Sequence, residues 1–322
     1  MKTLLLSIGL CTFLFCSAQE TYVPDFFFEN YLENNGMGNG IPNDNYVTTA
    51  NISNVQILDI TNQGVIADLT GIEDFTQLTT LYCSNNQIVS LDLSNNSQLT
   101  TLNCSANFIN SLDVTGCPLL GFLDCSYNSI TTTIDLSNNS LLAHFDCAEN
   151  SITLIDFTNN PLLAFLVCRD NQLTALDLVQ NTQLTTLNCA DNSLYLLDLS
   201  ENPLLQTIMV INNDLTCMDL RNVDLQNILI LLATGNSSLF CIEVDDAAAA
   251  TATWAGAVDP QTSFSENCAN PCSTLSLDEQ LEQDKVIVKI VDLMGRETAI
   301  VPNTPLVYHY SDGSTERKLI SE

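Results

Sequence analysis

Positive charge is scarce in this sequence of 322 residues. Eight lysine and arginine residues stand against 38 aspartate and glutamate residues, so the formal net charge at pH 7 is -30. Between residues 19 and 271 the only basic residues are Arg169 and Arg221. Binding to nucleic acid or to an anionic membrane surface requires clustered lysine and arginine. The composition therefore predicts no nucleic-acid partner.

Long apolar runs are also missing, except at the start of the chain. Lys2 precedes an apolar run from Leu4 to Phe15, and the small residues Ser17 and Ala18 follow it. This layout is typical of a secretory signal peptide that is cleaved after Ala18. The run is too short for a transmembrane helix, and no later segment has the pattern of one.

A repeat of 21 residues fills most of the chain. It is seen in "LYCSNNQIVSLDLSNNSQLTT", and its copies begin at Leu81, Leu102, Leu123, Phe145, Leu166 and Leu187. A degenerate copy begins at Ile208, and an irregular segment from Val55 precedes the array. Such a period indicates stacked units that bury a common core. The pattern L-x-x-L-x-C-x-x-N-x-L-x-x-L-D-L resembles the bacterial leucine-rich-repeat family, which implies a solenoid that binds partners.

The fold class that we predict is mainly β, with parallel strand ladders on two sides of a flattened solenoid. One short strand is expected through L-x-C and another through L-D-L of every coil. Because side chains alternate along a strand, the leucines and cysteines should point inward, and the aspartate and the residue before the cysteine outward. Each coil should turn at an asparagine whose amide satisfies buried backbone groups. This column is Asn86, Asn107, Asn128, Asn150, Asn171, Asn192 and Asn213.

One cysteine per coil should form a column in the core. Neighbouring rungs lie about 4.8 Å apart, which is longer than the Cβ separation that a disulfide prefers. A straight row of sulfurs also cannot surround a zinc ion. We therefore predict buried, unreactive thiols for the column, which is Cys83, Cys104, Cys125, Cys147, Cys168 and Cys189.

An aspartate column should lie on the surface of the L-D-L side. Its carboxylates could bridge calcium, the one cofactor that we consider, or could accept hydrogen bonds from backbone amides near the following serine or threonine. The sequence leaves both uses open. The weak calcium candidates are Asp92, Asp113, Asp135, Asp156, Asp177, Asp198 and Asp219.

Outward residues on the L-x-C side vary from coil to coil. Variation at a fixed geometry is how a solenoid adapts a concave surface to a partner, so this face is the candidate binding site for an extracellular protein or glycan. A solvated face without a partner is the alternative. The candidate residues are Tyr82, Asn103, Asp124, Tyr127, Asp146, Glu149, Val167, Asp170, Asn188, Asp191 and Met209.

Two further functions are alternatives to a binding module. A calcium-stabilised structural adhesin would depend on the aspartate column. A carboxylate-dependent glycan hydrolase would use Asp124 and Asp146, because carboxylates about 5 Å apart suit retaining glycosidases. However, an open ladder should leave neither pKa strongly raised, and the two histidines, His144 and His309, form no metal-spaced cluster. We therefore expect no enzyme and no catalytic residue.

Both ends of the array need caps. The segment "VPDFFFENYLENNG" from Val23 predicts a short amphipathic helix that Asp25 caps, and Trp254 should plug the far end. Cys241 and Cys268 bracket the far cap and are the disulfide candidates, whereas the sequence assigns no role to Cys117, Cys217 and Cys272. The predicted domains are the signal peptide 1–18, the N-terminal cap 19–51, the repeat solenoid 52–233, the C-terminal cap 234–270 and the linker with a terminal domain 271–322.

The last 40 or so residues change to alternating β sequence. The pieces "KIVDLMGRE", "PNTPLVYHYSDGS" and "ERKLISE" resemble the type A sorting domain of the bacterial type IX secretion system, although the usual longer opening strands with a Pro-Asn-Pro signature are missing. The resemblance implies a small β-sandwich-like domain that contacts the type IX secretion machinery. With the signal peptide, it predicts a secreted or outer-membrane cell-surface protein.

Overall fold

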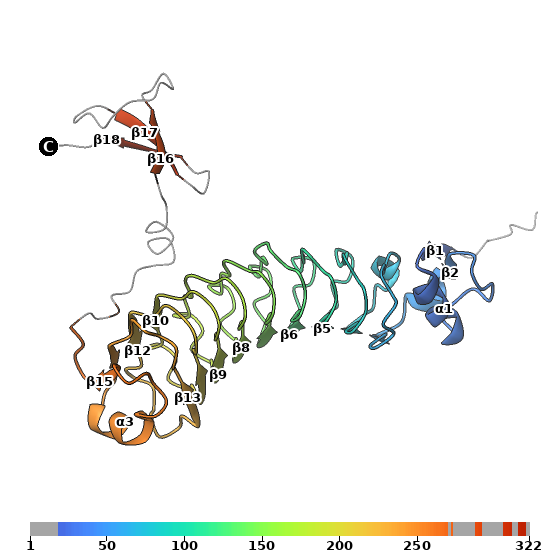
Figure 1. The fold of residues 1–322 in the computed structure, drawn as a ribbon. Coiled ribbons are helices and arrows are strands. Elements are labelled where there is room, and N and C mark those ends of the chain that lie inside the picture. The colour runs from blue at the N-terminus through green and yellow to red at the C-terminus, as the bar shows by residue number, and fades with distance from the viewer. Residues whose placement is uncertain (1–18, 270–271, 273–286, 292–304, 311–314, 320–322) are drawn as a thin grey trace, which may run out of the picture.

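The computed structural model describes residues 19–269, 272, 287–291, 305–310 and 315–319. Figure 1 shows a row of stacked coils between a small N-terminal unit and the helix α3 (Ala247–Trp254). No helix in this described part of the chain is long and apolar enough to cross a bilayer. The predicted signal peptide lies outside the described residues.

The N-terminal unit caps the first coil. Strands β1 (Glu20–Tyr22) and β2 (Tyr46–Thr48) pair antiparallel, beside the helices α1 (Phe26–Asn34) and α2 (Thr49–Ile52). As predicted, Asp25 caps α1, because its Oδ1 accepts hydrogen bonds from two backbone amides at the helix start at 2.9 Å each. Phe28 and Leu32 are fully buried and so close the end of the core.

Nine short strands form the first parallel sheet, in the order β13-β11-β9-β8-β7-β6-β5-β4-β3. Equivalent residues pair directly, as Leu102 does with Leu123, so the coils stack in register. The middle residue of each strand is buried and the outer two face outward, as the alternation predicts. The strands are β3 (Ile57–Asp59), β4 (Thr80–Tyr82), β5 (Thr101–Asn103), β6 (Phe122–Asp124), β7 (His144–Asp146), β8 (Phe165–Val167), β9 (Thr186–Asn188), β11 (Thr207–Met209) and β13 (Ile230–Leu232). A 3-10 turn, η1 (Ile72–Asp74), lies between β3 and β4.

The second ladder is shorter than the sequence predicts. Strands β10 (Leu196–Asp198), β12 (Cys217–Asp219), β14 (Cys241–Glu243) and β15 (Ser263–Ser265) form a parallel sheet at the C-terminal end only. The prediction of a strand through L-D-L of every coil is therefore wrong for the coils before β10. Those L-D-L segments exchange no backbone hydrogen bonds with one another, whereas Leu199 N donates to Asp219 O at 2.9 Å in the later pair.

Asparagine side chains add hydrogen bonds between the coils. Asn107 Nδ2 donates to Cys83 O and to Cys104 O at 3.0 Å each, and its Oδ1 accepts from Ile88 N at 3.0 Å. The predicted role of this column is thus confirmed. A second buried column, which the sequence reading did not single out, donates in the same way to carbonyls of the previous coil: Asn96, Asn139, Asn160, Asn181 and Asn202. Cys117 occupies the corresponding position of the coil between the first two.

The cysteine column lies in the core, as predicted. All six side chains have 0% exposure, and none forms a disulfide. Burial raises the pKa of Cys83 and of Cys189 to about 12, and it raises the pKa of the other four thiols as well. A neutral buried thiol is a poor nucleophile, so the column acts as packing.

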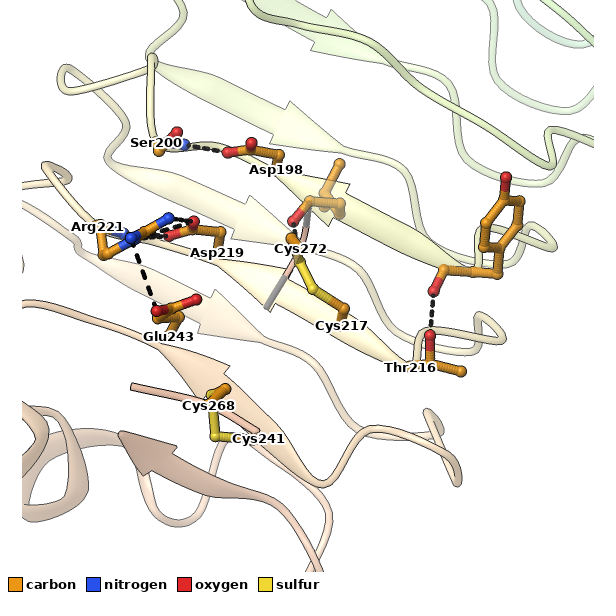
Figure 2. The surroundings of a disulfide bond; sticks show 12 residues. Asp198, Ser200, Thr216, Cys217, Asp219, Arg221, Cys241, Glu243, Cys268 and Cys272 are labelled. Carbon is orange, nitrogen blue, oxygen red and sulfur yellow. Dashed lines mark hydrogen bonds and ion pairs between the residues drawn. A yellow bond between two sulfur atoms is a disulfide. The ribbon is translucent and has the colours of Figure 1, made fainter. Parts of the chain in front are cut away.

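Two disulfides close the C-terminal end of the solenoid (Figure 2). Cys241 and Cys268 are bonded, as predicted, with their Cα atoms 5.9 Å apart. Cys217 on β12 is bonded to Cys272, with a Cα separation of 5.5 Å, a pairing that the sequence did not assign. Trp254 is 8% exposed and packs on the end of the core, as expected of a plug.

The C-terminal region contains a separate three-stranded antiparallel sheet. Its strands are β16 (Ile287–Val291), β17 (Pro305–Tyr310) and β18 (Thr315–Leu319), and β17 lies between the other two. The alternating sequence at this end does form strands.

Candidate partner-binding face

The outward side of the nine-stranded sheet, here named the ladder face, carries the variable residues. Those predicted at the last position of each strand lie there and are partly exposed, except Val167, which is 9% exposed. They form one row from β4 to β11, because the strands pair in register. This row is Tyr82, Asn103, Asp124, Asp146, Val167, Asn188 and Met209.

The other predicted candidates lie just beyond the strands, in a tight turn. Tyr127, Glu149, Asp170 and Asp191 have φ values of 53°, 56°, 53° and 55°. In these left-handed conformations residues other than glycine carry a cost of about 1–3 kcal/mol. The same turn position is occupied in other coils by Asn85, Ala106 and Asn212. Bulky side chains at Tyr127 and Glu149 are therefore kept in the centre of the array despite backbone strain.

An aromatic stack lies at the first position of three neighbouring strands. His144 stacks between Phe122 and Phe165, with ring centroids 4.2 and 4.1 Å away and planes within 13° and 6° of parallel. The sequence analysis did not identify this stack as a feature of the candidate binding face. The sequence contains a signal for it: β4, β5, β9 and β11 all carry threonine at this position, and the three strands between them carry aromatic residues instead.

Two carboxylates lie on the same strands as the stack. Asp124 and Asp146 pair across β6 and β7, at the outward position two residues after Phe122 and His144. Burial raises the pKa of Asp146, and the neighbouring Asp124 adds to that rise. Asp146 is thus less well solvated than an open ladder predicts.

Arg169 lies near this pair and lowers the pKa of Asp146, but its guanidinium bonds to other groups. Its guanidinium donates to Glu149 Oε1 at 2.9 Å, to Asp170 and to the hydroxyl of Tyr127 at 2.7 Å. It also lies 5.7 Å from the centre of the Tyr127 ring, within the range of a cation–π contact. These contacts join three of the strained turn residues into one rim beside the stack.

The aspartate column uses its carboxylates locally. Each accepts a hydrogen bond from the backbone amide two residues on, as Asp92 does from Ser94 N at 3.0 Å and Asp113 from Thr115 N at 2.9 Å. The same bond forms at Asp135, Asp156, Asp177, Asp198 and Asp219. Bonds from Ser94 lower the pKa of Asp92, and bonds from Thr115 lower that of Asp113. The second of the two predicted uses is therefore observed.

Asp219 departs from the rest of its column. It was predicted on the surface, yet it is 0% exposed. Figure 2 shows Arg221 turned onto it, with Nε 3.1 and 3.0 Å from its two carboxylate oxygens and Nη1 3.7 Å from Glu243 Oε1. The guanidinium replaces the water that a surface carboxylate would have, which allows both acids to be buried.

No group of three or more metal-ligating side chains is found among the described residues. A shallow hollow on the L-D-L side is lined by Leu91, Asp92, Leu93, Ser94, Asp113, Thr115 and Gly116. Its two carboxylates come from neighbouring coils but are each turned toward their own backbone amide.

Comparison with known proteins gives matches among solved structures alone. No protein-family model and no curated protein matches the chain. Internalin C2 from Listeria monocytogenes is 24% identical, with a TM-score of 0.53, and the match covers 71% of this chain and 98% of that one. A leucine-rich-repeat protein of Leptospira interrogans is 21% identical over 54% of each chain, with a TM-score of 0.48. The functional domain of InlJ from Listeria monocytogenes, described as including a cysteine ladder, is 20% identical over 94% of this chain and 99% of that one, with a TM-score of 0.37. The register of the coils and the likeness to internalin C2 together show that this chain has the leucine-rich-repeat solenoid fold.

Proposed function

We propose that this protein is a noncovalent binding module that recognises an extracellular protein through its ladder face. The observation that carries the proposal is the contrast between the two sides of the same strands. The inward positions keep leucine and cysteine in coil after coil, whereas the outward positions change type at a fixed geometry. A rigid frame with varied side chains suits recognition.

The chemistry of the face favours binding over catalysis. Asp124 and Asp146 lie on the outward side of the sheet, and neither lines the hollow on the L-D-L side. A hydrolase needs a site that encloses the reacting group and excludes water. A partner protein needs only a surface.

A crosslinking experiment tests the use of this face. The photoreactive residue p-benzoylphenylalanine is introduced at Tyr82 or Met209 on the ladder face, or at Val89 or Val179 as controls. The two valines are 50% and 43% exposed and lie outside the strands of the sheet. The variants are incubated with intact cells of the source organism and of its neighbours. Crosslinks to the same protein from both ladder positions and from neither control position support the proposal; equal yields from all four positions refute it.

Export by the type IX secretion system is part of the same proposal. The signal-like start, the resemblance at the C-terminus and the two disulfides all support an extracellular destination. Deleting residues 287–322 should leave the protein in the periplasm, whereas the full chain should reach the medium or cell surface. Equal export of both forms would remove this route.

A further inference from the structure

The aromatic stack forms an apolar ridge across the middle of the ladder face. Phe122, His144 and Phe165 cover one another's ring faces at 4.1–4.2 Å, so the rings turn their edges outward. The adjacent strands carry Thr101 and Thr186 at the same position, which limits the ridge to β6, β7 and β8. Sugars pack on the faces of aromatic rings, and these faces are largely occupied. The ridge therefore suits a narrow aliphatic chain better than a sugar ring.

The two carboxylates beside the ridge differ in how far their hydrogen-bonding capacity is used. Asp124 Oδ2 accepts from Asn103 Nδ2 at 3.0 Å, and its Oδ1 accepts from Ser126 N at 3.1 Å and from Ser126 Oγ at 2.7 Å. Asp146 Oδ1 accepts from Ala148 N at 3.0 Å. No donor among the described residues bonds to Asp146 Oδ2. A carboxylate oxygen on a half-buried acid is thus open to a ligand.

Arg169 lowers the pKa of Asp146 through its charge, but its guanidinium bonds to neither Asp124 nor Asp146. Arg169 is held by Glu149, Asp170 and Tyr127. Burial lowers the pKa of His144, so its ring is neutral at neutral pH and adds no charge between the two phenylalanines. Because two carboxylates lie at about the spacing of adjacent rungs, a cation between them would relieve their repulsion.

We propose that strands β6 to β8 bind a lysine or arginine side chain of an extended partner segment. The aliphatic stem of that side chain lies along the ridge, and its cationic head lies between Asp124 and Asp146. Lysine and arginine have this divided character, with an apolar stem and a charged end. The inference rests on the proposed function, because it assigns the chemistry of the partner for the same face.

Peptide selection on the full chain tests the inference without knowledge of the natural partner. A phage-displayed library of random decapeptides is selected against the immobilised protein at 0.15 M salt. The strongest peptide is then synthesised with a fluorophore, and its Kd is measured by anisotropy. We expect lysine or arginine at one fixed place with apolar neighbours, and loss of binding when glutamine replaces that residue.

Matched variants separate this site from general attraction to an acidic protein. The double variant D124N/D146N should raise Kd at least tenfold. The pair D92N/D113N removes the same charge from the L-D-L side and should change Kd less than twofold. F122T/F165T gives the two end positions of the ridge the residue found in neighbouring coils, and it should raise Kd about fivefold. Circular dichroism confirms that each variant is folded.

Three results would overturn the inference: selected peptides without a fixed cation, no selected peptide at all, or equal weakening by D92N/D113N and D124N/D146N. Each of these leaves the crosslinking test of the ladder face intact. Failure of the partner chemistry is therefore distinguishable from failure of the proposed function.

Discussion

Replacing Asn107 with alanine tests how the coils are held together. The side chain is 5% exposed and bonds to two coils. Its Oδ1 accepts from Ile88 N in the preceding coil at 3.0 Å, and its Nδ2 donates to Cys83 O and Cys104 O at 3.0 Å each. Alanine fills less space and makes none of these bonds.

The expected loss of stability depends on which hydrogen bonds remain to each backbone group that Asn107 now contacts. Ile88 N is buried and has no other acceptor among the described residues, so an orphaned amide costs about 2 kcal/mol. Cys83 O keeps a bond from Asn86 Nδ2 at 3.1 Å, and Cys104 O keeps one from Asn128 Nδ2 at 3.0 Å. Each carbonyl therefore loses about 0.5 kcal/mol, the low end for a net hydrogen bond. We expect the free energy of unfolding to fall by about 3 kcal/mol.

Urea unfolding followed by circular dichroism measures this change, with Asn110→Ala as the control, because Asn110 is exposed. The control should stay within about 0.5 kcal/mol of the parent, as surface substitutions do. Hydrogen exchange supplies a local readout, since the Ile88 amide should exchange faster in the Asn107 variant alone. A loss below about 1 kcal/mol, or an unchanged Ile88 amide, would refute the idea that this column stabilises the contact between coils.

Three other substitutions and the buried thiols give further tests. Ala106→Gly should stabilise the protein by about 1 kcal/mol, because φ is 52° there, whereas Ala143→Gly at negative φ should destabilise it. A melting temperature that shifts in the same direction in both variants would contradict the strain argument. Cys117→Asn should raise the free energy of unfolding, measured in urea, by about 1 kcal/mol, because it completes the second asparagine column. The new amide would donate to the carbonyl that now lies 3.8 Å from the thiol. A loss of stability would show that the site does not admit an amide. Arg221→Met should lower the free energy of unfolding by about 2–3 kcal/mol, because it leaves Asp219 buried and without its ion-pair partner. Adding Asp219→Asn should recover part of this loss. No recovery in the double variant would point to another cause. The six thiols of the cysteine column should not react with a thiol reagent at pH 8 until the protein unfolds, because burial raises their pKa and leaves too little thiolate. Rapid labelling of the native protein would refute this.

The sequence alone determined the direction of most side chains. A period of 21 residues with alternating polarity requires the leucines and cysteines to face one core, because only that arrangement buries the apolar side of every coil. The buried cysteine column, the asparagine turns and the bond between Cys241 and Cys268 were predicted on this basis and are confirmed. These features depend on the local pattern and on the ends of the array.

Tertiary structure decided how the coils meet away from the first sheet. The L-D-L segments look alike in every coil, yet strands form only from β10 onward, because backbone hydrogen bonds depend on the distance between coils and not on the pattern within one. The bond between Cys217 and Cys272 and the stacking of His144 between two phenylalanines likewise arise from neighbours 21 or more residues away in sequence. A repeat specifies which way a side chain points, whereas only the stacked coils specify what it touches.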